Sequence, residues 1–238
     1  MAIPRALEPA GIVLLDKPAG PSSFAMVAKL RGTTGARTGH AGTLDPFASG
    51  LLLLLSGWAT RQAAAFVGLD KRYLTRLDLT ATTTTGDPEG ELVARRAPPS
   101  AEELETALAG LRGEVELPVP AASAVKIRGE RAYRLHRRGV EAEMPLRRSR
   151  IDVLELVDRD DDGMATLDLR VSSGTYVRAI AAALGGHCRS LRRTEIGPFG
   201  IDEADPEVFL PVDDALARIG RERLPAAGSR THRTAEER

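Results

Sequence analysis

Two short aliphatic runs constrain the fold of this chain more than any other feature. They occupy residues 11–16 (GIVLLD) and 50–56, and the second contains five consecutive leucines at 51–55. Five apolar residues in a row fall far short of the ~20 that cross a membrane as a helix. Turn-forming residues follow each run, so each predicts a short strand buried in a globular core.

The remaining pattern predicts an α+β fold. Residues 71–80 alternate in polarity, as a half-buried strand does, and Ser100 with Glu103 forms a capping box at the start of a helix. Strands and helices are mixed without regular βαβ alternation, which favours a largely antiparallel central sheet flanked by helices. Further strands are predicted at 123–127, 151–157, 165–171 and 190–196, a loop at 32–42, and helices at 23–30, 60–67, 130–138, 176–184 and 211–218.

Composition and scattered motifs exclude several kinds of site. Cys188 is the single cysteine, which excludes an internal disulfide, and the four histidines lie far apart without ligand spacing. No Gly-Lys-Ser/Thr phosphate loop is present. We therefore expect no metal site. The N-terminus lacks the apolar core of a signal peptide, so a cytoplasmic protein without membrane contact is expected.

The charge is balanced overall but unevenly distributed. The chain has 33 basic and 33 acidic side chains. Residues 121–150 nevertheless contain nine cations and three acids, and residues 151–169 reverse this balance. A local cationic face is typical of a polyanion-binding surface. A solvated surface laced with salt bridges is the alternative interpretation.

One polar segment stands beside the leucine-rich run. In GHAGTLDPFASG (39–50), Asp45 is a lone carboxylate whose backbone is pushed toward an extended conformation by Pro46. A rigidly placed carboxylate at the mouth of a buried strand suits a catalytic role. Asp-Pro is also a common turn opener, and that alternative stays open from these residues alone.

This segment resembles the signature of the bacterial tRNA pseudouridine-55 synthases of the TruB type. Five further motifs in the same order resemble that family. They are GIVLLDKPAGPSSF (11–24), Asp-Lys-Arg-Tyr (70–73), Ser-Ala-Val-Lys…Arg-Ala-Tyr (123–133), Ser-Gly-Thr-Tyr-Val-Arg (173–178) and Leu-Arg-Arg (191–193). The resemblance implies a pseudouridine synthase fold over residues 1–224, with a basic RNA-contacting insertion at about 121–150. Residues 225–238 are expected to be a disordered tail.

The resemblance also implies a reaction and the residues that carry it. The enzyme flips uridine 55 out of the T loop of tRNA and isomerises it to pseudouridine without a cofactor. Asp45 would be the catalytic carboxylate, acting at C1′ or C2′ of the ribose, and Arg178 would pair with it. Tyr73 would stack on the flipped base, and Tyr176 and Leu191 would line the pocket.

Three further residues would bind the RNA. His40 would fill the space that the flipped nucleotide leaves in the T loop, by stacking and not as an acid or base. Lys17 and Lys126 would contact phosphates.

The resemblance leaves two alternatives and one departure. A tRNA-folding chaperone that opens the T loop, and a guide-dependent synthase acting on ribosomal RNA, are the alternatives. Only about 40 residues follow Gly200, so we expect the C-terminal PUA-type domain of the family to be absent. Binding should then depend on the T arm. A monomer without a protein partner is expected.

Overall fold

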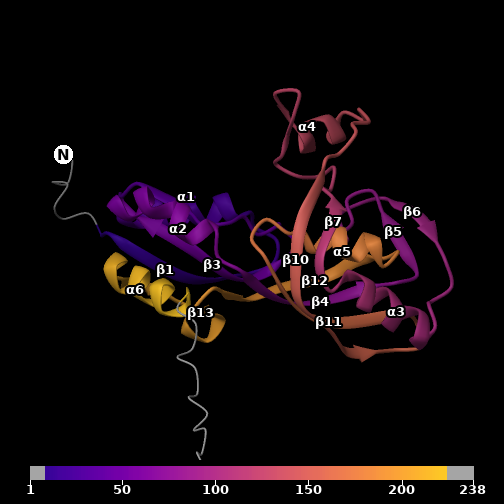
Figure 1. Cartoon of the computed structure of the whole chain (residues 1–238). Helices are drawn as coiled ribbons and strands as arrows, with labels where there is room; N and C mark the ends of the chain where they lie inside the picture. Colours follow the sequence, from indigo (N-terminus) through magenta and orange to yellow (C-terminus); the bar gives the residue numbers. More distant parts are fainter. Residues whose placement is uncertain (1–8, 224–238) are drawn as a thin grey trace, which may run out of the picture.

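One curved sheet of ten strands runs through the molecule (Figure 1). The structure is a computed structural model that describes residues 9–223. The strands are β1 (Gly11–Lys17), β2 (Thr38–His40), β3 (Ser49–Ser56), β4 (Lys71–Asp78), β7 (Gly113–Pro118), β10 (Leu146–Arg159), β11 (Met164–Val171), β12 (His187–Ile196), β13 (Phe199–Gly200) and β14 (Asp205–Leu210). Their order is β14-β1-β3-β12-β4-β11-β10-β7, with β2 paired to β3 and β13 to β12.

Helices cover parts of this sheet, and two small hairpins lie outside it. The helices are α1 (Ser23–Thr34), α2 (Ala63–Val67), α3 (Ala101–Leu111), α4 (Ala132–Arg137), α5 (Val177–Ala183) and α6 (Val212–Arg223), with short 3-10 helices η1 (Gly57–Gln62) and η2 (Ile201–Glu203). The hairpins are β5 (Ala81–Thr83) with β6 (Leu92–Arg95), and β8 (Lys126–Ile127) with β9 (Glu130–Arg131). The mixed, largely antiparallel α+β fold predicted from the sequence is confirmed.

The pairing of β3 with β12 joins the two halves of the sheet. Within the described residues it is the one parallel pairing, and it places Arg193 opposite Gly50. A Cβ on Gly50 would lie 2.2 Å from the Arg193 carbonyl oxygen, and the φ of Gly50 is +106°. Only glycine allows this close approach of two backbones.

The leucine-rich strand is buried on both faces. On one face, Leu52 and Leu54 pack with Val27 of α1. On the other face, Leu51, Leu53 and Leu55 pack in the cluster that includes the α6 side chains. Because no side of β3 faces water, its sequence is continuously apolar instead of alternating.

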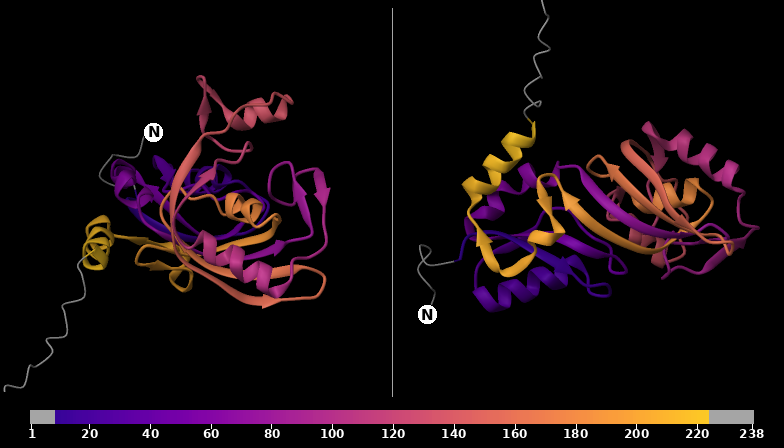
Figure 2. Two further views of the ribbon diagram at one scale, coloured as in Figure 1. Left: turned by 45° about the vertical axis from the view of Figure 1, so that its right-hand side comes forward. Right: turned by 90° about the horizontal axis from the view of Figure 1, so that it is seen from below.

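The other half of the sheet packs on one face only. Inward side chains of β4 and β11 pack against Leu104 and Leu108 of α3 and Ile180 of α5 (Figure 2). The outward face carries ion pairs such as Arg72 with Asp168, 2.7 Å apart. Because one face of this half of the sheet is exposed to solvent, the residues of β4 alternate in polarity, which is the pattern that predicts this strand.

Residues 119–145, between β7 and β10, project from the sheet, and we call them the arm (Figures 1 and 2). The arm contains β8, β9 and α4. Arg128 and Gly129, at the tip of its hairpin, both have positive φ values, +48° and +90°. This conformation matches the two-residue turns that suit the twist of a hairpin.

Some sequence predictions need correction. The strand predicted at 123–127 is limited to 126–127, and residues 38–40 of the predicted loop form β2. Residues 60–62 of the α-helix predicted at 60–67 belong instead to the 3-10 helix η1. The edge strands β7 and β14 are mostly exposed, so they lack the apolar alternation that predicts a strand. The tail predicted at 225–238 lies outside the described residues.

Two general properties bear on the site. Among the helices described, none has both the length and the apolar character needed to cross a membrane. Within residues 9–223, no three His, Cys, Asp or Glu side chains gather as metal ligands would.

Candidate active site

Asp45 is held by the guanidinium of Arg178. Asp45 lies in the loop between β2 and β3, and Arg178 is the second residue of α5. Arg178 Nε donates to Asp45 Oδ2 at 2.9 Å and Nη2 donates to Oδ1 at 3.3 Å. The Arg178 side chain is 3% exposed, whereas that of Asp45 is 32% exposed. A buried, planar fork thus orients a carboxylate that remains open to solvent.

The other donors of Arg178 bind two separate segments. Nη1 donates to the Thr85 carbonyl at 2.8 Å, in the turn between β5 and β6. Nη2 donates to the Ala122 carbonyl at 3.0 Å, at the base of the arm. The carboxylate of Asp87 lies 3.6 Å from Nη1 and is itself buried. One guanidinium therefore connects α5, the 84–91 turn, the arm and Asp45.

Asp87 was not among the residues singled out from the sequence. It lies in a polar stretch at 82–90 that predicts only a turn. The available signal is that Asp87 precedes Pro88, as Asp45 precedes Pro46, but Asp205-Pro206 is a third Asp-Pro pair in the chain. A single sequence does not show that both carboxylates converge on one arginine.

A cleft of about 1140 Å³ opens beside Asp45 and Arg178. Its other walls come from the 84–91 turn, the base of the arm at Ala121 and Ala122, and arm residues within 132–144. Tyr133 and His136 of α4 are among them. The exposed edge of the Asp45 carboxylate therefore faces a space bounded by the arm.

Three of the predicted pocket residues share one apolar cluster. Tyr73 on β4 and Leu191 on β12 are 8% and 6% exposed, and they pack in the cluster that also contains Leu44, the neighbour of Asp45. Tyr176 is partly buried against the same cluster. The Arg147 guanidinium lies over the Tyr176 ring, 5.7 Å from its centre. The structure thus brings Tyr73, Tyr176 and Leu191 near the Asp45 loop, although none of them lines the arm-side cleft.

His40 is a half-buried imidazole on β2. Among the described atoms, its Nδ1 is buried without a hydrogen-bond partner. Burial, reinforced by the positive charge of Arg193, lowers the pKa of His40. The ring is therefore neutral near pH 7, which suits packing better than phosphate binding.

The prediction that Lys17 contacts phosphate is wrong for this conformation. The Lys17 side chain is fully buried at the end of β1. Its Nζ donates to the carbonyls of Pro18 and Pro21, both at 2.8 Å, and to that of Pro46 at 3.3 Å. Burial lowers the pKa of this ammonium. Lys17 therefore joins the turn after β1 to the segment that follows Asp45.

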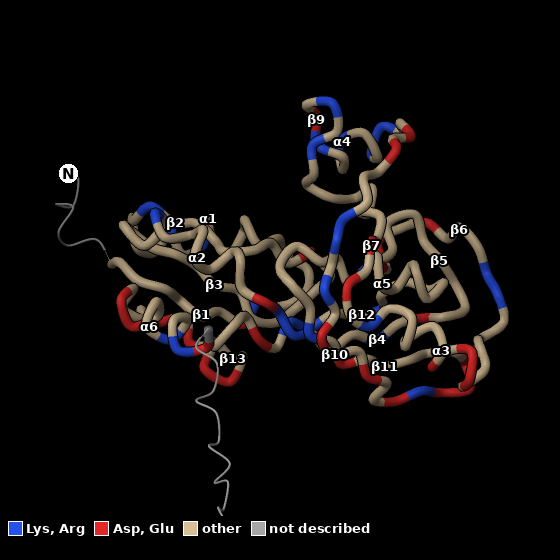
Figure 3. Tube along the Cα trace, viewed as in Figure 1, with Lys and Arg blue, Asp and Glu red and all other residues tan. Residues whose placement is uncertain are grey.

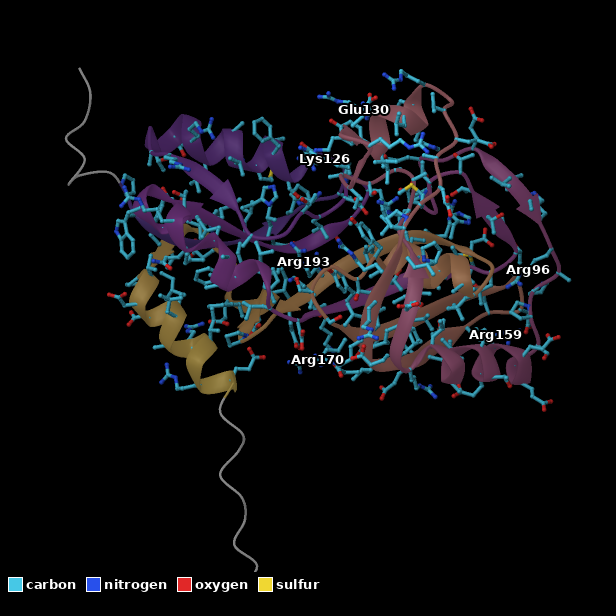
Figure 4. The ribbon with its side chains drawn as sticks, turned by 45° about the horizontal axis from the view of Figure 1, so that its top comes forward. Arg96, Lys126, Glu130, Arg159, Arg170 and Arg193 are labelled. Atoms are coloured by element: carbon cyan, nitrogen blue, oxygen red, sulfur yellow. The ribbon has the colours of Figure 1, made fainter. Side chains whose placement is uncertain are left out.

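Lys126 and the basic segment, in contrast, lie at the surface. Lys126 lies on β8 in the arm, away from the sheet (Figure 4). All nine cations of residues 121–150 are exposed, and they follow the arm and the first part of β10 (Figure 3). In the described part of the chain, Arg138 and Arg150 are the two of them that form ion pairs. The cationic face inferred from the sequence is present.

Comparison with known proteins identifies relatives over most of the chain. The model of the TruB family pseudouridylate synthase (N terminal domain) matches residues 29–177. A tRNA pseudouridine synthase B of Mycobacterium sp. (strain KMS) is 44% identical over 208 residues, which cover 82% of this chain and 70% of that protein. The protein of the same name from Corynebacterium jeikeium (strain K411) is 39% identical, over 89% of this chain and 77% of that protein.

Solved structures share the fold. A chain of a Cbf5-Nop10-Gar1 complex superposes with a TM-score of 0.63 at 27% identity, covering 84% of this chain and 53% of that chain. A chain of an H/ACA RNP bound to a substrate RNA containing 2′-deoxyuridine gives a TM-score of 0.61 at 23% identity, again over 84% of this chain and 52% of that chain. The present chain thus spans about half the length of these structural relatives. Its fold, its ordered motifs and its curated relatives agree: the chain belongs to the TruB family of pseudouridylate synthases.

Proposed function

We propose that this chain is a tRNA pseudouridine synthase that isomerises uridine 55 in the T loop of tRNA, with Asp45 as its catalytic carboxylate. The observation that carries the proposal is the geometry of Asp45: a buried arginine orients it, and its open side faces a cleft. The names of the curated relatives, at 39–44% identity, support tRNA as the substrate.

The chemistry requires a carboxylate at the ribose. The bond from N1 of uracil to C1′ breaks, the base turns, and C5 bonds to C1′ while its proton is lost and N1 gains one. The product is an isomer, so the balance calls for no electron or group donor. Asp45 would either attack C1′ or take a proton from C2′. Both routes need a carboxylate held in one direction, which the two hydrogen bonds from Arg178 provide.

The uridine must leave the base stack to reach Asp45. Flipping costs a few kcal/mol, and aromatic contacts that receive the base offset part of that cost. We assign stacking to Tyr73 and the pocket wall to Tyr176 and Leu191, which cluster around the Asp45 loop. The neutral ring of His40 would occupy the gap left in the T loop.

The arm would hold the RNA backbone. Its exposed cations, including Lys126, face solvent beside the cleft, and most have no acidic partner among the described ion pairs. Such cations supply affinity through phosphates without reading sequence. We propose that the T arm binds between this arm and the sheet. We propose that the protein acts as a monomer in the cytoplasm, where tRNA is made.

An unmodified T-arm hairpin transcript tests the function. After incubation with the protein and no guide RNA, pseudouridine is mapped at nucleotide resolution, and we expect it at the position of uridine 55 alone. Asp45→Ala should bind the hairpin and leave no product. Asp158→Asn, which neutralises an exposed carboxylate on β10, is the matched control and should remain active.

Other outcomes would replace the proposal. Product that forms only when a guide RNA is added would indicate a guide-dependent synthase. Faster tRNA folding by both the wild type and Asp45→Ala, without product from either, would indicate a chaperone.

A further inference from the structure

We propose that Ser23 is a positioning residue. Its hydroxyl fixes the direction of the Asp45 carboxylate by hydrogen bonding to both the amide and the carbonyl of Leu44. The proposal rests on the function assigned above and adds to it a residue that never touches the RNA. It concerns the second serine of the Ser-Ser pair at the start of α1.

The hydroxyl of Ser23 makes two hydrogen bonds to a single residue. Its Oγ accepts from the Leu44 amide and donates to the Leu44 carbonyl, both at 2.8 Å. Ser23 and Leu44 are each 2% exposed, so water does not compete for these bonds. Leu44 directly precedes Asp45. Fixing both polar groups of its backbone therefore restricts the direction in which Asp45 leaves the loop.

The rest of the loop is held in a similar way, from a different strand. Arg193 on β12 is 1% exposed and lies near the centre of the molecule (Figure 4). Its guanidinium donates to the carbonyls of Gly42 at 3.3 Å and Thr43 at 3.4 Å, and to that of Leu51 at 2.7 Å. No described carboxylate forms an ion pair with it. Burying an unpaired cation is costly. Two of its hydrogen bonds go to the loop that precedes Asp45 and the third goes to β3.

Ser23 and its neighbour Ser22 have different structural roles. Ser22 is the N-cap of α1, and its hydroxyl accepts from the Ala25 amide at 3.1 Å. Removing either hydroxyl deletes hydrogen bonds made by the same two-residue segment at the start of α1. Only the Ser23 hydroxyl contacts the Asp45 loop. The pair therefore supplies its own control.

The expected effect falls on the chemical step. Misplacing a reacting group by about 1 Å can cost on the order of a hundredfold in rate. Without the two hydrogen bonds from Ser23, Leu44 is still held by the apolar core. We therefore expect a smaller effect for Ser23→Ala, a loss of about tenfold or more in the single-turnover rate. RNA affinity should stay within about twofold, because the arm and its cations are untouched. Ser22→Ala should change neither quantity.

The test compares Ser23→Ala, Ser22→Ala and the wild type on the T-arm hairpin. Single-turnover rate, hairpin affinity and melting temperature are measured for each. Both variants should melt a few degrees lower, since each loses buried or capping hydrogen bonds. A rate loss in Ser23→Ala at matched stability therefore separates positioning from general destabilisation.

A second readout reports on the carboxylate without requiring activity. The Arg178 Nε–H donates to Asp45, and its nuclear magnetic resonance signal can be identified by its absence in Arg178→Lys. We expect its exchange with solvent to accelerate severalfold in Ser23→Ala and to stay unchanged in Ser22→Ala. If the wild type were inactive on the hairpin, the proposed function would fail, yet this signal would still decide the role of Ser23.

Two results would overturn the proposal. One is a Ser23→Ala variant that matches Ser22→Ala in both rate and exchange. The other is a slower Ser23→Ala variant with unchanged Nε–H exchange, because its effect would then not pass through the orientation of the carboxylate.

Discussion

Replacing Arg178 by methionine should destabilise the whole domain as well as disorient Asp45. The substitution removes two hydrogen bonds to Asp45 and two to the carbonyls of Thr85 and Ala122. It also leaves the carboxylate of Asp87, whose side chain is 8% exposed, without its cationic partner. The hydrogen bonds that this carboxylate accepts from the Thr85 hydroxyl and the Glu89 amide remain. Asp45 is one-third exposed and can rehydrate, so the buried Asp87 carries most of the cost.

The magnitude follows from that burial. Removing one partner of a buried charge pair costs about 3–5 kcal/mol because the other charge stays unpaired. The free energy of unfolding of a domain is only about 5–15 kcal/mol, so Arg178→Met should remove a large share of it. Asp87→Asn in the same chain removes the stranded charge, and the double variant should be at least about 1 kcal/mol more stable than the sum of the single effects predicts.

Urea titration followed by circular dichroism measures all four proteins of this cycle, with linear extrapolation to zero denaturant. Additivity within about 0.5 kcal/mol would refute the reasoning, since it would mean that Arg178 and Asp87 do not interact in solution. A loss below about 1 kcal/mol for Arg178→Met would refute the burial argument separately. Single-turnover rates of the folded variants should fall wherever Arg178 is missing, with or without Asp87.

Three further predictions concern pH, backbone geometry and RNA binding. Burial lowers the pKa of Lys71 from 10.5 to about 8 in the folded chain. Between pH 8 and 10.5 the unfolded chain therefore binds more protons than the folded chain, and the free energy of unfolding should rise by about 3 kcal/mol across that pH window. Urea titrations should show this rise in the wild type, and the rise should be absent in Lys71→Met. Gly50→Ala should prevent stable folding because its Cβ would overlap the Arg193 backbone, whereas Gly32→Ala, in open space on α1, should raise stability by about 0.8–1 kcal/mol in thermal melts. Lys126→Ala should weaken T-arm binding and reduce the slope of log affinity against log salt by about 0.7–0.9; an unchanged slope would show that this ammonium contacts no phosphate.

The sequence predicts the fold where a strand is buried and fails where it is not. The leucines of β3 and the alternation of β4 both reflect burial, on two faces and on one, so both strands are predicted. The edge strands β7 and β14 are mostly exposed, and hydrogen bonding to a neighbour leaves no apolar pattern in their residues.

The site shows the same division. The pairing of Asp45 with Arg178 is expected from family motifs, and the structure places them in contact. Lys17 matches a motif as well, but the motif does not reveal that its ammonium is buried under three carbonyls. Asp87 and Ser23 act through partners far away in the chain, and such contacts become visible only when the segments are placed in space.

The position of β12 sets the order in which this protein can assemble on the ribosome. β12 lies between β3 and β4 in the sheet, yet it is made long after both of them. At a synthesis rate of about 5–20 residues per second, β4, which pairs with β12 from Lys71 to Asp78, waits on the order of 10 s for this neighbour. During that time the edge of β4 that β12 later covers is unpaired, and it is a site for wrong pairing with other chains. We therefore expect truncations that end before residue 187 to aggregate during synthesis instead of accumulating as a folded N-terminal half.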